Sequence, residues 1–217
     1  SKHNSVIPIK PFYESLKFIV DQDKYKGDNS AQPFVIIGDG LAAIEIAFSL
    51  RKRWPKRPIQ LKVKKGRKLT KKILETMKDL YIGVIYEDPS VLQPTLVCTG
   101  NKSFEWIKDS GLSTDINGRI LTKNSLQVLD HPDLFAVGDC AVIKGSHRPP
   151  SGVWAVRSAI PLAKNLEAAS KGLKLYKWKP QRQAIQILDI NSSLDNSKAF
   201  VDWNGYMVGP YNWLSRL

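Results

Sequence analysis

Short apolar runs and stretches with helical apolar spacing follow one another along the first half of this chain. Residues 34–37 are typical of a buried strand, whereas residues 41–53 repeat apolar side chains at the spacing of a helix. The elements predicted in this half are helices at 12–20, 41–53 and 69–80, and strands at 34–37, 59–63, 83–86 and 94–99. Because strand, helix and strand in succession form a crossover unit, we expect an α/β fold with a doubly wound parallel sheet over residues 33–100. Ligands are expected beyond the carboxyl ends of its strands.

The second half of the chain has a less regular pattern. Residues 120–121 and 133–137 are expected to be extended, and residues 153–166 have the apolar spacing of a helix. Strand-like stretches at 185–190 and 199–203 occur together with Asn-Gly and Gly-Pro turn signals. We therefore expect three parts, namely residues 1–102, residues 103–170, and a truncated C-terminal extension of β-strands at 171–217.

A glycine turn joins the first of these strands to the helix at 41–53. Gly38 allows the tight turn, Gly40 lets a pyrophosphate approach the backbone, and Ala43 stands where a third glycine sets helix-to-strand packing. Amide groups at a helix N-terminus attract phosphates. The predicted phosphate-binding residues are Gly38, Asp39, Gly40, Leu41, Ala42 and Ala43. Residues 1–102 are thus expected to form a Rossmann-like NAD(P)-binding domain with a leading segment, although a strand, turn and helix without a ligand stays an alternative.

The 217 residues carry a net charge of +13, and this charge is concentrated in one segment. Residues 51–78 contain thirteen lysines and arginines against a single acid, Glu75. Such a segment suits an anionic membrane surface, an acidic partner, a nucleotide phosphate or a solvated face. No nucleic acid is expected to bind, because Trp54 is the only aromatic side chain among these charges.

Other chemistries find little support in the sequence. Cys98 and Cys140 lie far apart in apolar strand-like runs, so we expect two reduced core cysteines and no redox-active pair. The three histidines lack metal-ligand spacing. No run reaches the roughly 18 apolar residues that cross a bilayer, and no signal peptide is recognisable. We expect a cytoplasmic fragment of a longer protein, with peripheral membrane contact through residues 51–78 as an alternative.

The run Leu-Phe-Ala-Val-Gly-Asp at 134–139 resembles the second flavin motif of the pyridine nucleotide-disulfide oxidoreductase superfamily. Residues 118–122 and 126–128 resemble the lead-in strands of that motif, and residues 94–100 resemble the superfamily's apolar strand that ends in Thr-Gly. The resemblance implies that residues 103–170 are the C-terminal part of an FAD-binding domain. The cofactor contacts that it implies are Gly100, Gly138 and Asp139, the backbone of Val153, Trp154 and Ala155 near the isoalloxazine ring, and Glu45 near the nicotinamide.

A narrower resemblance rests on residues 6–11, 148–157, 161–166 and 176–181. These segments are similar to the type II NADH dehydrogenase-like flavoprotein module that is fused to selenide, water dikinase in some bacteria and cyanobacteria. The resemblance implies an FAD-dependent NAD(P)H oxidoreductase that transfers hydride from NAD(P)H to flavin. It also implies a fused selenophosphate synthetase domain as a partner.

The chain departs from the superfamily pattern in ways that affect function. The superfamily's N-terminal FAD motif is absent, so we expect weak or no FAD retention and no activity from this chain alone. The acidic residue that binds the NAD ribose after the second strand is missing, and Lys64, Lys65 and Arg67 occur there instead. Basic side chains suit the 2′-phosphate of NADPH, so NADPH is an alternative to NADH as the bound nucleotide. Loss of nucleotide binding is a further alternative. A non-catalytic nucleotide-binding or regulatory module is therefore the alternative to an oxidoreductase.

Overall fold

The computed structural model describes residues 6–86, 93–99, 103–148, 150–181, 185–190, 198–203 and 206–211. The chain divides into two compact units, one made of Ser1–Thr99 with Ile185–Leu217 and the other of Gly100–Ala184. Three parts were expected along the sequence. The difference arises because the C-terminal strands pack into the core of the first unit rather than forming a body of their own.

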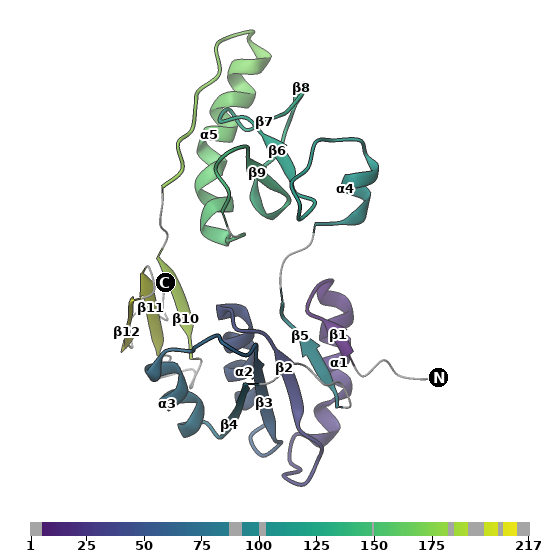
Figure 1. The fold of residues 1–217 in the computed structure, drawn as a ribbon, viewed down its shortest axis with the longest axis vertical. Helices are drawn as coiled ribbons and strands as arrows, with labels where there is room; N and C mark the ends of the chain where they lie inside the picture. The colour runs from purple at the N-terminus through teal and green to yellow at the C-terminus, as the bar shows by residue number, and fades with distance from the viewer. Residues whose placement is uncertain are drawn as a thin grey trace. The chain divides into compact units, whose positions relative to one another are not determined.

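A parallel five-stranded sheet forms the centre of the first unit (Figure 1). Its order is β1-β5-β2-β3-β4, and every neighbouring pair is parallel. The strands are β1 (Val6–Pro8), β2 (Phe34–Ile37), β3 (Ile59–Val63), β4 (Ile82–Tyr86) and β5 (Thr95–Val97). The expected α/β class and parallel sheet are thus confirmed. β1 was not predicted, because three residues that include a proline show no strand periodicity; Pro8 is tolerated because β1 is an edge strand.

Three α-helices and one short 3₁₀ helix connect these strands. They are α1 (Phe12–Asp21), η1 (Asp23–Tyr25), α2 (Leu41–Arg53) and α3 (Lys71–Asp79). The bounds of α2 agree with the prediction, since Gly40 precedes its first turn and Pro55 follows its last residues. α3 begins later than predicted because Thr70 caps it, and the Thr70 side chain accepts the N–H of Ile73.

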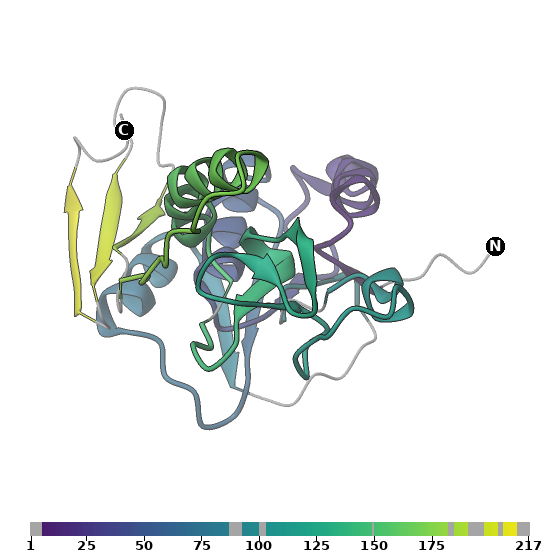
Figure 2. The ribbon, with the colours of Figure 1, turned by 90° about the horizontal axis from the view of Figure 1, so that it is seen from above.

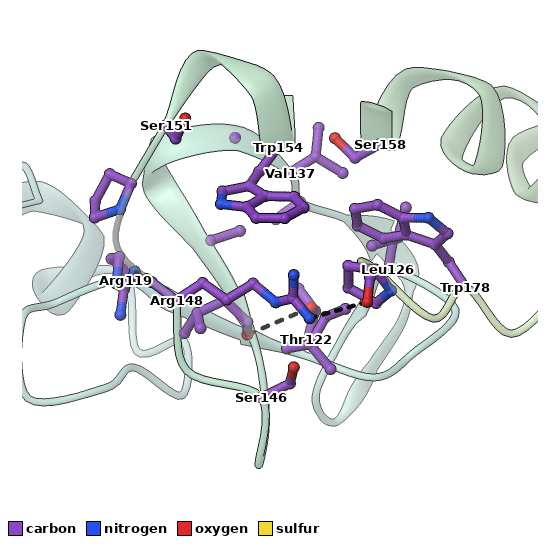
Figure 3. Close-up of a pocket in the computed structure, with 17 residues that line it drawn as sticks. Arg119, Thr122, Leu126, Val137, Ser146, Arg148, Ser151, Trp154, Ser158 and Trp178 are labelled. Carbon is purple, nitrogen blue, oxygen red and sulfur yellow. Dashed lines mark hydrogen bonds between the residues drawn. The ribbon is translucent and has the colours of Figure 1, made fainter. Parts of the chain in front are cut away.

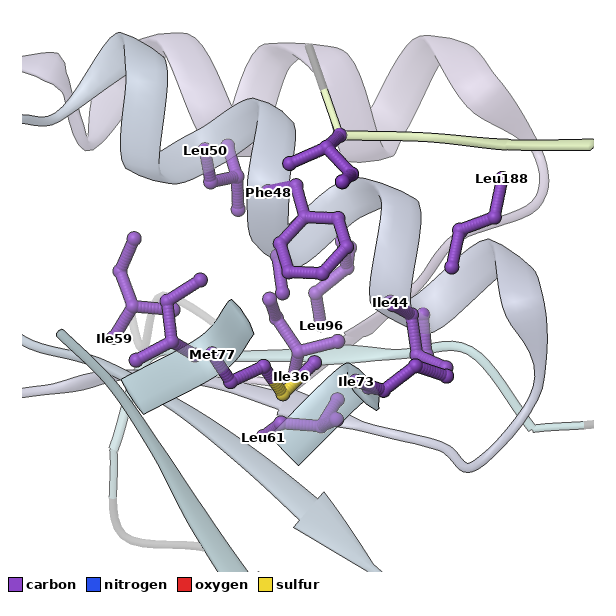
Figure 4. Close-up of a cluster of buried hydrophobic side chains, with 14 of the residues drawn as sticks. Ile36, Ile44, Phe48, Leu50, Ile59, Leu61, Ile73, Met77, Leu96 and Leu188 are labelled. Carbon is purple, nitrogen blue, oxygen red and sulfur yellow. The ribbon is translucent and has the colours of Figure 1, made fainter. Parts of the chain in front are cut away.

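The core of the first unit lies between the sheet and helices α2 and α3 (Figure 4). Ile44 and Phe48 of α2 belong to the same buried cluster as Ile36 of β2 and Leu61 of β3, and α3 adds Met77. Burying one such side chain contributes about 1.5–3 kcal/mol. This packing fixes α2 against β2 and so fixes the turn between them.

A separate antiparallel sheet completes the first unit from the C-terminal part of the chain. Its strands are β10 (Gln186–Asp189), β11 (Ala199–Trp203) and β12 (Tyr206–Tyr211), in that order. Leu188 and Phe200 are buried in the α2 core, and the Thr70 hydroxyl lies 3.6 Å from the Met207 sulfur. Figure 1 and Figure 2 both show this sheet beside α3.

The second unit contains a four-stranded sheet and a long helix. The sheet order is β8-β7-β6-β9, and only the β6–β9 pair is parallel. The elements are α4 (Glu105–Asp109), β6 (Ile120–Thr122), β7 (Gln127–Val128), β8 (His131–Phe135), η2 (Gly138–Cys140), β9 (Ala141–Ile143) and α5 (Gly152–Ser170). The strand predicted at 133–137 lies two residues earlier, and Cys140, which was expected in a strand, lies in a 3₁₀ turn.

Candidate functional site

The turn after β2 accepts only a residue without a side chain at Gly38. A Cβ added to Gly38, whose φ is +155°, would lie 3.0 Å from the Cys98 carbonyl oxygen and 3.0 Å from the Ala43 Cβ. The Gly38 amide also donates a 3.0 Å hydrogen bond to the Lys62 carbonyl. The turn is therefore packed tightly between β5, β3 and the first turn of α2, and Ala43 occupies the close-packing position that the sequence assigned to it.

Gly40 has the opposite surroundings, because no heavy atom lies within 4 Å of a Cβ built there. It precedes α2 in an extended conformation, and no side chain caps this helix. Leu41 is half-buried and Ala42 is exposed. The Gly40 carbonyl accepts the amides of Ala43 and Ile44, so the amides of Leu41 and Ala42 precede the first intrahelical bonds. This end of α2 therefore carries a partial positive charge beyond the carboxyl end of β2.

A charged pair lies at the edge of the same turn. The Arg67 Nε lies 3.0 Å from an Asp39 carboxylate oxygen, with side-chain exposures of 71% and 37%. Arg67 follows a tight turn after β3, in which its amide donates to the Lys64 carbonyl over 3.1 Å. Lys64 and Lys65 are exposed in this turn. An ion pair as exposed as this contributes about 0–1 kcal/mol, so Arg67 can change partner at little cost.

Glu45, which the family resemblance places near the nicotinamide, contacts strand β10. It is half-buried on α2, and burial raises the pKa of its carboxyl group above the usual value. The backbone N–H of Asp189 donates to this carboxyl group and opposes that rise, whereas the Asp189 side-chain charge adds to it. The carboxyl group of Glu45 therefore contacts the C-terminal sheet.

Several of the basic residues in 51–78 are used inside the first unit. Arg51 donates to the backbone carbonyls of Trp54 and Arg57 after α2 and to that of Tyr81 before β4. Arg53 pairs with Asp23. Arg57 is 1% exposed, donates to Gln22, and stacks on aromatic rings 5.0–5.4 Å away. The exposed basic surface is therefore smaller than the sequence count indicates.

A pocket in the second unit is lined by η2, β9, the start of α5 and the segment that follows α5 (Figure 3). The space inside it, part of it open to solvent, is about 510 Å³. The Arg148 guanidinium stacks on Trp154 with 4.6 Å between its central carbon and the ring centre. Figure 3 shows Trp178 beside these two side chains, and Arg148 also donates to the carbonyls of Pro180 and Gln181. The pocket therefore offers flat aromatic and guanidinium surfaces.

The predicted flavin residues gather at the N-terminal end of α5. Gly138 has a φ of +76°, and a Cβ there would lie 3.7 Å from that of Ala155. Gly138 and Trp154 line the pocket, whereas Asp139, Val153 and Ala155 lie next to lining residues without lining it themselves. The Ser151 side chain caps α5 by accepting the Val153 amide at 3.3 Å. Gly100 lies outside the described residues.

A buried ion pair supports one wall of this pocket. The Arg119 guanidinium contacts the Asp115 carboxylate over 2.7 Å, with side-chain exposures of 7% and 2%. A second guanidinium nitrogen of Arg119 donates to the Arg148 carbonyl over 2.6 Å. The sequence did not identify Arg119, Arg148 or Trp178 as site residues, because no spacing rule joins three residues from separate segments.

Within the described ranges, both cysteines are free, and burial raises the pKa of the Cys98 thiol to about 12. No group of three or more histidine, cysteine, aspartate or glutamate side chains suitable for a metal ion occurs in these ranges. In the same ranges, no helix has both the length and the apolar character needed to cross a membrane.

Comparison with known proteins gives sequence matches to a probable NADH dehydrogenase and to a ferroptosis suppressor protein, although no family model matches the chain. A probable NADH dehydrogenase of Dictyostelium discoideum is 32% identical over 73 residues, which are 34% of this chain and 16% of that protein. Ferroptosis suppressor protein 1 of Xenopus tropicalis is 25% identical over an alignment of 228 positions, gaps included, that covers 88% of this chain and 59% of that protein. The chain thus spans less than two thirds of either relative.

Solved structures agree with these matches at the level of the fold. A water-forming NADH oxidase from Lactobacillus brevis, bound to NADH, superposes with a TM-score of 0.65 at 16% identity and covers 93% of this chain and 48% of that one. A NAD-dependent persulfide reductase from A. fulgidus gives a TM-score of 0.62 at 16% identity, covering 92% and 40%. The chain therefore shares its fold with these two oxidoreductases and with a pyridine nucleotide-disulfide family oxidoreductase from Enterococcus faecalis.

Proposed function

We propose that this chain carries the NAD(P)H-binding part and the second flavin-binding segment of an FAD-dependent NAD(P)H oxidoreductase. The observation that carries the proposal is the glycine turn at Gly38–Gly40. It lies beyond the carboxyl ends of parallel strands and is open on the side of Gly40. Dinucleotides bind at such places in open α/β sheets.

The turn supplies what a pyrophosphate requires. Gly38 lets the backbone turn sharply, Gly40 leaves room for the approach, and the amides of Leu41 and Ala42 are available to phosphate oxygens. The sequence matches to NADH dehydrogenase-like proteins support this assignment. In this proposal the turn orients the nucleotide, and the chemistry belongs to the cofactors.

In this proposal the pocket in the second unit receives part of a flavin. The indole of Trp154 and the guanidinium of Arg148 provide flat surfaces for a planar ring, and the positive end of α5 lies at its edge. A bound flavin would supply the acceptor for hydride from NAD(P)H. Gly138 and Trp154 would hold and orient it, and Trp178 would exclude water from one side.

The proposal predicts that a large side chain at Gly40 blocks nucleotide binding without unfolding the chain. In Gly40→Leu the new side chain enters open space, so we expect an unchanged urea denaturation midpoint and a loss of NADH and NADPH binding of about tenfold or more. Tryptophan quenching during titration measures the binding. Gly27→Leu is the matched control, because Gly27 has equally open surroundings in the same unit. Equal binding by the wild type and Gly40→Leu would contradict the proposal.

A non-catalytic nucleotide-binding or regulatory module is a second candidate, favoured by the contact of Glu45 with β10. The carboxyl group assigned by resemblance to the nicotinamide is used for an internal hydrogen bond in this alternative. The two candidates differ in the activity of the full-length protein. Gly40→Leu would abolish NAD(P)H oxidation if the parent protein is a reductase, and would leave the activity of the parent protein intact if the chain is a non-catalytic module.

The fusion to a selenide, water dikinase stays a prediction that rests on the resemblance of residues 6–11, 148–157, 161–166 and 176–181. The proposal of peripheral membrane contact rests on the exposed lysines of residues 51–78, such as Lys52 and Lys56. It predicts co-sedimentation of the chain with vesicles that contain about 30% phosphatidylserine at low salt, and its loss at about 0.5 M salt. Sedimentation at the background level at low salt would contradict this contact.

A further inference from the structure

We propose that Arg67, paired with Asp39 at the glycine turn, binds the 2′-phosphate of NADPH and gives this site a preference for NADPH over NADH. The inference rests on the proposed function, because it names the nucleotide that the glycine turn takes. It assigns a specificity-determining role to one arginine among several basic neighbours.

The position of Arg67 follows from the register of the sheet. β2 and β3 are parallel with Ile37 opposite Lys62, and the Gly38 amide donates to the Lys62 carbonyl over 3.0 Å. The two strands therefore end side by side. In a dinucleotide-binding fold, the residues after the second strand meet the adenosine ribose of a nucleotide whose phosphates lie on the glycine turn. The turn at 64–67 occupies that position here.

The turn at 64–67 reverses the chain after β3 and so brings Arg67 toward β2. The Arg67 amide donates to the Lys64 carbonyl, and Gly66 between them has a φ of +87°. The outcome is the 3.0 Å contact between Arg67 and Asp39, a residue of the glycine turn itself. The guanidinium thus lies at the border between the phosphate turn and the expected ribose position.

The chemistry of this border favours a phosphate over a free ribose diol. Residues 64–70 contain no acid, and the carboxylate beside them, that of Asp39, is paired with Arg67 over 3.0 Å rather than left to accept the two ribose hydroxyls. Lysine and arginine side chains have donors only. A ribose diol gains little from them, whereas a 2′-phosphate has the charge and the acceptor oxygens that match them.

Asp39 orients Arg67 but leaves the guanidinium accessible to a ligand. The carboxylate contacts Nε, and 71% of the arginine side chain is exposed. A guanidinium can donate from its terminal nitrogens to a phosphate in the bidentate geometry that it favours. Arg67 also balances the charge of Asp39, which would otherwise repel the pyrophosphate of either nucleotide.

The test compares nucleotides with and without the 2′-phosphate on the 217-residue chain. NADPH, NADH, 2′,5′-ADP and 5′-ADP are titrated against the wild type, Arg67→Gln and Lys68→Gln, with tryptophan fluorescence as the readout. Lys68→Gln is the matched control, because it removes the same charge one residue further along an exposed segment. Circular dichroism checks that each variant is folded.

We expect the wild type to bind NADPH more tightly than NADH and 2′,5′-ADP more tightly than 5′-ADP. Arg67→Gln should weaken the two 2′-phosphorylated ligands by about tenfold or more and leave the other two within about twofold. Lys68→Gln should leave all four within about twofold. Equal wild-type binding of NADPH and NADH, or equal losses in both variants, would overturn this inference alone. A folded wild-type chain that binds none of the ligands would overturn the proposed function as well.

Discussion

Replacing Trp54 by alanine is expected to lower the free energy of unfolding of the first unit by about 3–5 kcal/mol. Trp54 is fully buried where α2 ends, and its ring lies edge-on to Phe34 with 4.9 Å between centroids. Its indole N–H donates to Asp23 over 2.7 Å, and the Arg57 guanidinium lies 5.0 Å from its ring. The substitution leaves a cavity and removes the indole donor from the Asp23 carboxylate. It also removes one of the aromatic rings on which the buried Arg57 guanidinium stacks.

Urea denaturation followed by far-ultraviolet circular dichroism measures this loss. Trp106→Ala is the control, because Trp106 is 63% exposed and its removal should cost less than about 1 kcal/mol. A loss below about 1 kcal/mol in Trp54→Ala would contradict the role assigned to Trp54 in joining α2 to β2.

Asp115→Ala is expected to destabilise the second unit by a similar amount, about 3–5 kcal/mol, because it leaves the buried Arg119 guanidinium without its partner. The Asp115 carboxylate also accepts the backbone amides of Asn117 and Arg119 at 2.9 Å each. Arg119 in turn holds the Arg148 carbonyl. The variant should therefore also loosen the Arg148–Trp154 wall of the pocket. Urea denaturation is again the measurement, and Asp109→Ala, on an exposed residue of the same unit, is the control.

The same carboxylate gives a pH dependence whose sign follows from its surroundings. Burial raises the pKa of Asp115, but the hydrogen bonds and charge of Arg119 act in the other direction and leave the pKa below the usual value. Its contribution to stability is present above the pKa of an unfolded aspartate, about 4, and is lost as the pH falls through the lower folded value. The denaturation midpoint of the wild type should thus fall more steeply below pH 4 than that of Asp115→Ala. Equal slopes would contradict this assignment.

The sequence predicts the fold best where local signals and burial agree. The bounds of α2 follow from Gly40 before it and Pro55 after it, and β3 follows from a clear apolar alternation. β1 could not be predicted, since its place in the sheet depends on pairing with β5, which is distant along the chain. The position of the C-terminal strands in the first unit depends on side chains such as Leu188 and Phe200 meeting α2, and no local pattern contains that information.

In the candidate site, too, some features follow from the local sequence and others depend on contacts between distant residues. The glycine turn could be located from spacing alone, because Gly38 and Gly40 follow an apolar strand and precede a helical pattern, although the contacts of Gly38 with Cys98 and Lys62 could not be predicted. Two other contacts could not be predicted, because each joins residues from different elements: the pairing of Arg67 with Asp39 and the stacking of Arg148 on Trp154. For Glu45, the sequence gives its place on α2 but not its contact with β10, which comes from the far end of the chain.

The return of the C-terminal strands to α2 has a consequence for synthesis of the protein. A ribosome that has made the parallel sheet and helices α2 and α3 has not yet made Leu188 or Phe200, which belong to the same core. The apolar surface that these residues cover therefore stays exposed until all of Gly100–Ala184 has been translated. The second unit can fold during that delay as an insertion in the first. Incompletely translated chains would thus expose apolar surface that invites chaperones or aggregation.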